Sequence, residues 1–216
     1  METSQIGDST KPFMPDEEIA YLTEVYRDAK VILEYGSGGT TRIAASLPGK
    51  FTMSVESDQK WALKLQQEID ASNPASPAII YHTEIGPVGP WGRPLSSESW
   101  RTFFRYPLDV WEEPFFRHPD TVLIDGRLRN ACLAMIMLRC TQPMTVLFDD
   151  YGVRPLYKEV EMIVRPSKLV GRLAHFDIEP GMTSKSQLSF LIKQFAAGSL
   201  HDGQGEGFYH QTTLPW

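Results

Sequence analysis

The stretch VILEYGSGGTTRIAA, Val31 to Ala45, decides the fold that this sequence predicts. Its first five residues form an apolar run with one acid, Glu34, and this pattern predicts a buried strand. A cluster of small residues, Gly36 to Gly39, follows at once, and a helical pattern begins directly after it. Glycines permit a tight turn and let bare backbone approach a ligand closely. We therefore expect a ligand site where this strand ends.

The rest of the chain repeats the alternation of short apolar runs with helical patterns. Further strands are predicted over Phe51 to Glu56, Ala78 to His82, Thr121 to Asp125, Met144 to Phe148 and Leu169 to Ile178. Such alternation is typical of βαβ units and a parallel sheet. The sequence thus predicts an α/β fold with a doubly wound, mostly parallel sheet. We expect one domain over residues 1–216, with residues 1–13 as a loose arm.

Composition excludes several classes of function. The charged content is 22% and the formal net charge is -6, so the chain has no global basic surface for a nucleic acid. The N-terminus has no signal-peptide pattern, and the longest apolar run, Ala131 to Leu138, is too short to cross a membrane. On one predicted helix, Cys132 and Cys140 stand roughly 12 Å apart, too far for a disulfide. These features predict a cytoplasmic protein with reduced thiols.

Two acids near the glycine turn indicate which kind of ligand it binds. Glu34 precedes the first glycine by two residues, and a carboxylate there repels a pyrophosphate but suits a ligand that carries an ammonium or a sulfonium. Thr41 stands where a dinucleotide-binding turn has its third glycine. Glu56 ends the second predicted strand, where an acid can accept the hydroxyls of a ribose.

The segments EYGSGGT and SVESD together resemble the first two motifs of the class I S-adenosylmethionine-dependent methyltransferases. Thr40 stands in place of the last glycine of the first motif. The resemblance implies a Rossmann-like fold and S-adenosylmethionine as cofactor. It also implies that Trp61 or the segment HTEIG, residues 82–86, flanks the adenine, and that this family closes its sheet with an antiparallel strand. We see a helix over Ser184 to Ala197 and no apolar strand after it. The expected cofactor-binding residues are Glu34, Gly36, Ser37, Gly38, Glu56, Ser57 and Trp61.

Three carboxylates follow two neighbouring predicted strands: Asp125 after the fourth, and Asp149 and Asp150 after the fifth. Because carboxyl ends of parallel strands share one edge, these acids are expected to converge. Like charges so close need a counterion, and Mg²⁺ prefers oxygen ligands. The pattern resembles metal-dependent sugar O-methyltransferases, which implies that Asp125, Asp149 and Asp150 bind Mg²⁺. Alternatively, Arg127 and Arg129 neutralise the acids or bind an anionic substrate.

The predicted catalytic residues are Asp125 and His82, and His118 is a further candidate base. Residues 84–120 form a long loop rich in proline and aromatic residues, which we expect to act as a lid or pocket wall. The predicted function is methyl transfer to a small molecule, at oxygen, with no nucleic acid or membrane partner and with a homo-oligomer as one option. Two alternatives stay open: a nicotinamide-dependent oxidoreductase, and a non-catalytic binding protein on the same fold.

Overall fold

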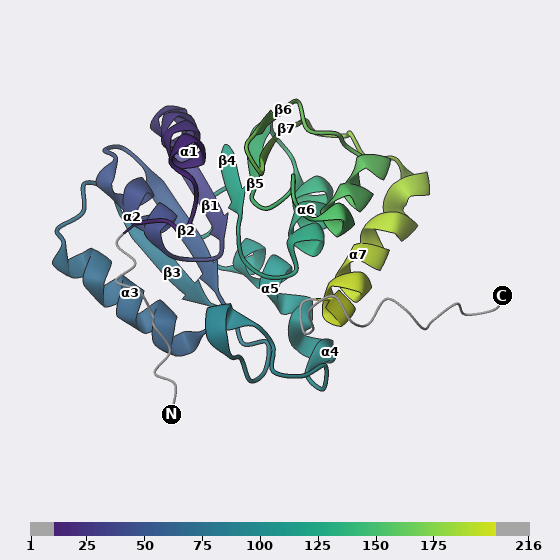
Figure 1. Ribbon diagram of the computed structural model, residues 1–216, viewed down its shortest axis with the longest axis horizontal. Helices are drawn as coiled ribbons and strands as arrows, with labels where there is room; N and C mark the ends of the chain where they lie inside the picture. Colours follow the sequence, from purple (N-terminus) through teal and green to yellow (C-terminus); the bar gives the residue numbers. More distant parts are fainter. Residues whose placement is uncertain (1–10, 202–216) are drawn as a thin grey trace.

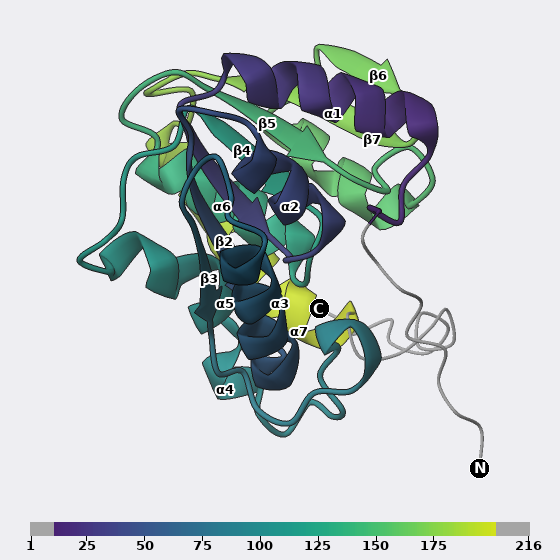
Figure 2. The same cartoon turned by 90° about the vertical axis from the view of Figure 1, so that its left-hand side faces the viewer.

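The computed structural model describes residues 11–201, with side chains as far as residue 196. Most of the predicted arm, residues 1–10, lies outside this range. A single sheet with strand order β3-β2-β1-β4-β5-β7-β6 runs through the middle of the molecule, and helices cover both of its faces (Figures 1 and 2). The strands are β1 (Val31–Tyr35), β2 (Phe51–Glu56), β3 (Ala78–His82), β4 (Thr121–Ile124), β5 (Met144–Phe148), β6 (Lys168–Val170) and β7 (Leu173–Ile178).

Strands β1 to β5 are parallel to one another, which confirms the predicted mostly parallel sheet. Alternate residues of β1 lie on opposite faces of the sheet, because successive side chains of a strand point to opposite sides. Ile32 packs with helices α1 (Asp16–Asp28) and α2 (Gly39–Ser46). Leu33 packs on the other face, in the core that includes α6 (Arg129–Arg139) and Leu191 of α7 (Leu188–His201). Helix α3 (Gln59–Ala71) contributes Leu65 and Ile69 to a third, smaller cluster.

The predicted strand Leu169 to Ile178 is instead a hairpin of β6 and β7. The break falls at Gly171, whose φ of +57° lies in the left-handed region that glycine adopts most readily. Strand β7 pairs antiparallel with both β5 and β6 and lies between them. The expectation that the sheet has no closing antiparallel strand was therefore wrong. The run from Leu169 to Ile178 contains a turn of two residues, Gly171 and Arg172, which its apolar pattern does not reveal.

The long segment 84–120 folds into four short helices, η1 (Pro90–Gly92), α4 (Trp100–Phe103), α5 (Arg105–Leu108) and η2 (Asp109–Glu112). Its inner residues Phe103, Tyr106 and Trp111 join the main core. Tyr35 of β1 ties the segment to the sheet, because its hydroxyl donates to Pro107 O at 2.8 Å and accepts from Trp111 Nε1 at 2.7 Å. The role of this segment as a lid stays a prediction.

Two smaller observations bear on the sequence-based expectations. Cys132 and Cys140 both carry free thiols. None of the helices within residues 11–201 has the length and apolar character needed to cross a membrane.

Candidate active site at the carboxyl ends of the strands

The register of the parallel strands aligns the predicted site residues along one edge of the sheet. Tyr35, the last residue of β1, is level with Val55 on one side and with Ile124 on the other. The glycine turn therefore follows β1 at the same level at which Glu56 ends β2 and Asp125 follows β4. At this edge the connection after β1 leads to β2 and the connection after β4 leads to β5 on the other side. Such a switch point is the usual place for a ligand in an open α/β sheet.

The glycines of the turn differ in what surrounds them. Gly36 has a φ of +101°, and a Cβ on it would lie 2.8 Å from the backbone of Gly126, so two loops meet there without side chains. A Cβ on Gly39 would lie 2.3 Å from the backbone nitrogen of Pro12. By contrast, a Cβ on Gly38 would have no atom within 4 Å. Gly38 is thus the glycine of this turn whose backbone is open to a ligand.

Glu34 lies beneath the turn and is fully buried. Its carboxylate accepts a hydrogen bond from the Tyr26 hydroxyl at 2.8 Å and from Thr41 Oγ1 at 2.5 Å. Thr41 Oγ1 also accepts from the backbone N–H of Gly38 at 2.9 Å. Burial raises the pKa of Glu34, and the bonds from Thr41 and Tyr26 oppose that shift. Glu34 therefore supports the turn from below, and its predicted contact with a cofactor stays a prediction.

Tyr26 and Thr41 are two site residues that the sequence did not single out for this role. Thr41 was noted as the residue that replaces a glycine, and the structure gives the physical reason for a threonine there. Its hydroxyl links the buried Glu34 carboxylate to the backbone of Gly38. Tyr26 lies on the face of α1 that packs on the sheet. The helical spacing of apolar residues in the sequence therefore predicted only a core position for it.

Glu56 is held by backbone groups at the end of β2. Its Oε1 accepts from Ser57 N at 2.7 Å and from Asp58 N at 2.9 Å, and its Oε2 accepts from Ser37 N at 3.4 Å. Burial raises the pKa of Glu56, while these backbone N–H groups lower it. The single long bond leaves Oε2 with capacity for a further donor.

Ser57 and Trp61 attach neighbouring loops to this position. Ser57 Oγ donates to Gly92 O at 2.9 Å, which fixes the loop of η1 over the end of β2. Trp61 Nε1 donates to Ser37 O at 2.9 Å, so the indole braces the glycine turn. Next to Gly92, Trp91 has a positive φ of 64° and its ring lies 5.9 Å from that of Phe13. The adenine contact predicted for Trp61 stays a prediction.

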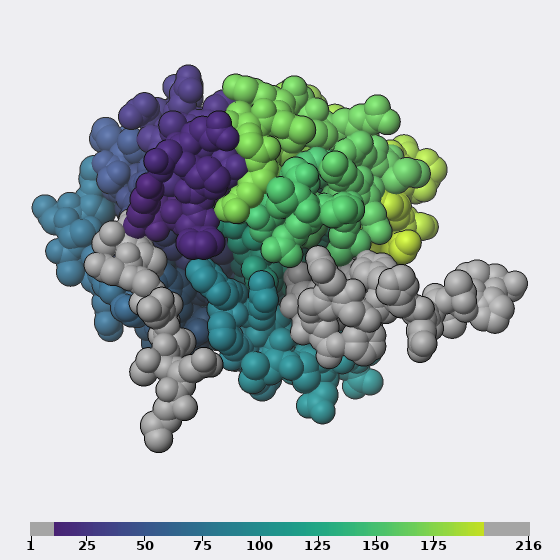
Figure 3. Space-filling model, viewed as in Figure 1, coloured from purple at the N-terminus to yellow at the C-terminus, as the bar shows by residue number. Residues whose placement is uncertain are grey.

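The three acids do converge, and arginine side chains lie among them. Arg129 Nη2 lies 3.0 Å from Asp125 Oδ1, and its Nη1 lies 3.7 Å from Asp149 Oδ2 and 3.4 Å from Asp150 Oδ2. Arg172 Nε lies 3.2 Å from Asp149 Oδ1 and 3.4 Å from Asp150 Oδ1. The same Nε lies 3.5 Å from Glu18 Oε2, where α1 meets the β6–β7 hairpin (Figure 3).

A magnesium ion does not fit this cluster. The Arg129 side chain is only 5% exposed and occupies the space among the carboxylates. It also donates to the backbone oxygens of Gly126 at 3.0 Å and of Asp149 at 2.6 Å. Within residues 11–201, no group of three or more His, Cys, Asp or Glu side chains is arranged to hold a metal. The structure therefore does not support the predicted metal ligands Asp125, Asp149 and Asp150, and arginine takes the counterion role.

Asp125 is the acid of this cluster with the most exposed side chain, at 35%. Burial raises its pKa and the Asp149 and Asp150 carboxylates raise it further, whereas Arg129 lowers it. A carboxyl group with a raised pKa is suited to exchange a proton near neutral pH.

The histidines lie apart from Asp125. His82 is level with Glu56 at the end of β3, so β2 and β1 separate it from β4. At roughly 4.8 Å between strands, His82 is about 14 Å from Asp125, so the two cannot act on the same atom. His118 precedes β4 and bonds to Thr141 N at 3.2 Å, before β5 begins, which places it at the opposite edge of the sheet. The structure thus contradicts the suggestion that His118 is a base at this site.

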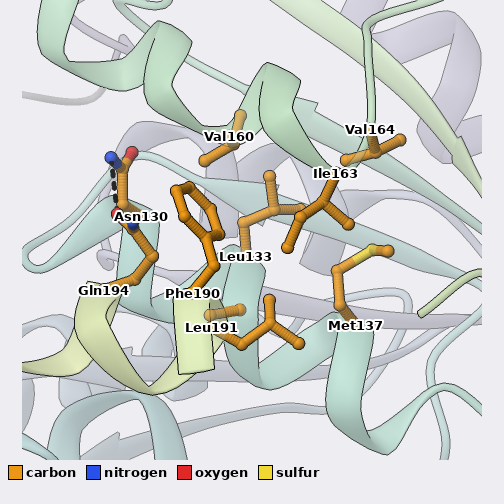
Figure 4. Close-up of a pocket in the computed structure, with 10 residues that line it drawn as sticks. Asn130, Leu133, Met137, Val160, Ile163, Val164, Phe190, Leu191 and Gln194 are labelled. Atoms are coloured by element: carbon orange, nitrogen blue, oxygen red, sulfur yellow. Dashed lines mark hydrogen bonds between the residues drawn. The ribbon is translucent and has the colours of Figure 1, made fainter. Parts of the chain in front are cut away.

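A separate cavity lies between α6, α7 and η3 (Pro155–Met162), and it contains none of the predicted site residues (Figure 4). Its walls are mostly apolar, with Asn130 and Gln194 at one end. Asn130 Nδ2 donates to Gln194 Oε1 at 3.2 Å, which leaves Asn130 Oδ1 and Gln194 Nε2 buried without a partner.

The solved structures that share this fold include two with low sequence identity to this chain. The O-methyltransferase TomG from Streptomyces achromogenes, solved with S-adenosylmethionine, is 14% identical, with a TM-score of 0.51 over 78% of this chain and 82% of its own. Cofactor-bound Rv0187 from MTB is 16% identical, with a TM-score of 0.51 over 79% of this chain and 83% of its own. No family model and no curated protein matches the chain. The sheet order and glycine turn define a class I S-adenosylmethionine-dependent methyltransferase, as the sequence motifs predicted.

A structure with much higher sequence identity supports a more specific family assignment. A methyltransferase-like protein from Silicibacter pomeroyi is 43% identical, with a TM-score of 0.81, and the match covers 86% of this chain and 96% of that one. The chain belongs to the same methyltransferase family, and it is an enzyme of that class. The family assignment counts against both the oxidoreductase and the non-catalytic alternatives.

Proposed function

We propose that this methyltransferase transfers the methyl group of S-adenosylmethionine to an oxygen atom of a small-molecule acceptor. The observation that carries the proposal is the pairing of Gly38 and Glu56 at one edge of the sheet. Gly38 offers open backbone, and the N–H of the adjacent Ser37 donates to Glu56 Oε2 at 3.4 Å. A bare turn beside a carboxylate with a free acceptor site suits a ligand with a cationic part and a ribose.

The residues fit the cofactor as follows. Glu56 Oε2 accepts the ribose hydroxyls, and the backbone of Ser37 and Gly38 lies along the methionine part. Glu34 and Trp61 hold that backbone in place from beneath and from the side. Segment 84–120 covers the ribose side, because Gly92 packs against Ser57 and Glu56. S-adenosylmethionine supplies a methyl group on a sulfonium, which is a strong electrophile.

Asp125 is the proposed proton acceptor. It follows β4 directly and adjoins Gly36, whose missing side chain lets the Gly126 backbone approach. As the acceptor oxygen takes the methyl group, its proton passes to the Asp125 carboxylate. Exclusion of water and alignment of the oxygen with the methyl group do most of the remaining work. His82 is too far from Asp125 to share this step.

The choice of oxygen and of a small molecule rests on two supports. TomG, which shares the fold, is an O-methyltransferase. The net charge of -6 gives this chain no general attraction to a nucleic acid. A cytoplasmic location and a homo-oligomeric state stay predictions.

Binding of S-adenosylhomocysteine tests the cofactor site. The ligand should raise the melting temperature of the wild-type protein, because a ligand that binds only the folded state stabilises it. Glu56→Gln should lose most of that gain, whereas Glu24→Gln, which changes an exposed acid of α1, should keep it. Absence of any shift at millimolar ligand would contradict the proposed site.

The type of acceptor needs a separate measurement. Release of S-adenosylhomocysteine should be followed with matched panels of small alcohols, phenols and amines. We expect turnover with hydroxyl compounds, and a loss of turnover in Asp125→Asn with ligand binding unchanged. Turnover restricted to amines would refute methylation at oxygen while leaving the cofactor site intact.

A further inference from the structure

The arginines of this enzyme divide by whether a carboxylate neutralises them. Arg129 and Arg172 are committed to the acid cluster, and Arg42, Arg105, Arg139, Arg154 and Arg165 each have an ion-pair partner. The described arginines without an ion-pair partner are Arg27, Arg93, Arg101, Arg117 and Arg127. All of these are exposed to solvent except Arg127, which is half-buried. Among the described residues, Arg127 is therefore a half-buried positive charge with no ion-pair partner.

The Nε atom of Arg127 is also buried without a hydrogen-bond partner. A buried N–H with no acceptor costs about as much free energy as a lost hydrogen bond, so proteins seldom retain one without a use. Arg42 has a buried, unpartnered Nε too, but its guanidinium is bound to Glu68. In Arg127 the Nε–H has no hydrogen-bond partner and the guanidinium has no ion-pair partner among the described residues.

The position of Arg127 adds the third observation. It lies two residues beyond Asp125 and directly after Gly126, whose backbone meets Gly36 of the glycine turn. The hydroxyl of Tyr106, which comes from segment 84–120, lies against Gly126, where a Cβ would clash with it. Arg127 thus lies where β4 ends, between the proposed proton acceptor and the segment expected to cover the site.

From these observations we propose that Arg127 recognises an oxyanion, such as a carboxylate or a phosphate, on the methyl acceptor. A guanidinium matches such a group with two parallel N–H donors, and the half-buried guanidinium of Arg127 has no carboxylate partner among the described residues. The first turn of α6, which begins at Arg129, adds a favourable dipole for a negative group. Arg127 is then a specificity-determining residue, and the acceptor is a small anionic hydroxyl compound. This inference rests on the proposed function.

Binding of small probes tests the inference without the true acceptor. Benzoate, phenyl phosphate and the neutral benzamide should be titrated into the protein with S-adenosylhomocysteine present. The wild-type protein should bind at least one of the two anions about tenfold more tightly than benzamide. Arg127→Gln should bind all three alike. The control Arg117→Gln, which removes an exposed arginine elsewhere, should behave as the wild type does.

The response to S-adenosylhomocysteine separates this inference from the cofactor proposal. If Arg127→Gln keeps its thermal shift with S-adenosylhomocysteine and loses the preference for anions, the inference holds. Equal affinity of the wild-type protein for benzamide and for both anions would overturn it. So would an anion preference that survives in Arg127→Gln. A failure to bind S-adenosylhomocysteine in the wild-type protein would instead contradict the proposed function.

Discussion

Replacement of Arg129 by methionine is the sharpest test of how the acid cluster is held together. Arg129→Met keeps an unbranched side chain but removes the guanidinium that faces Asp125, Asp149 and Asp150. It also removes the donors to backbone oxygens of Gly126 and Asp149. The carboxylates then lose one counterion and keep their mutual repulsion, with Arg172 and Arg154 left to face two of them.

The expected loss follows from the burial of Arg129. Removing one partner of a buried charge pair typically lowers the free energy of unfolding by about 3–5 kcal/mol. For a chain of this size, each kcal/mol shifts the melting temperature by about 2–4 °C, so we expect a fall of about 6–20 °C. Arg154→Met is the matched control, because Arg154 contacts the same cluster but its side chain is 52% exposed. An exposed pair of this kind contributes less than about 1 kcal/mol.

The pH dependence of unfolding is an independent check on the role of Arg129 as a counterion. Without Arg129, which lowers the folded-state pKa of Asp125, that pKa rises further above its unfolded value. The folded state then binds protons more tightly than the unfolded state, so its stability falls as pH rises. Because the wild-type pKa of Asp125 is about 8, urea unfolding of Arg129→Met should show a larger deficit at about pH 9 than at about pH 6. Equal losses in the two variants, or a deficit that grows on acidification, would refute this reasoning.

The remaining predictions concern the glycine turn, the proton acceptor and the metal. Gly36→Ala should lower the free energy of unfolding by about 2–4 kcal/mol in urea titrations, because its φ is positive and its Cβ meets backbone. Gly38→Ala should unfold as the wild type does but bind S-adenosylhomocysteine weakly by calorimetry; normal binding would show that the turn does not contact the ligand. The initial rate should rise with pH through the raised pKa of Asp125, whose carboxylate form accepts the proton, and a flat profile would exclude it as the base. A chelator should leave that initial rate unchanged. A loss of rate that magnesium restores would show that the acid cluster binds a metal after all.

Much of the fold follows from local pattern. The apolar runs placed all the parallel strands, because a buried strand of a doubly wound sheet is apolar on both faces. The glycine turn and Glu56 marked the edge where a ligand binds, since strand order alone brings carboxyl ends together. The hairpin of β6 and β7 escaped detection because β6 has only 3 residues and a turn of only two residues, Gly171 and Arg172, separates it from β7.

The sequence by itself determined the class of the enzyme, the edge of the sheet that forms the site and the acids that gather there. Only the tertiary structure decided what neutralises those acids. In sequence, Arg127 and Arg129 were equivalent candidates, yet one lies among the carboxylates and the other has no ion-pair partner. Arg172, which completes the cluster, bonds through its backbone to Glu18, 154 residues away. Charge compensation depends on distances of a few ångströms between side chains from separate elements, and no local periodicity encodes those distances.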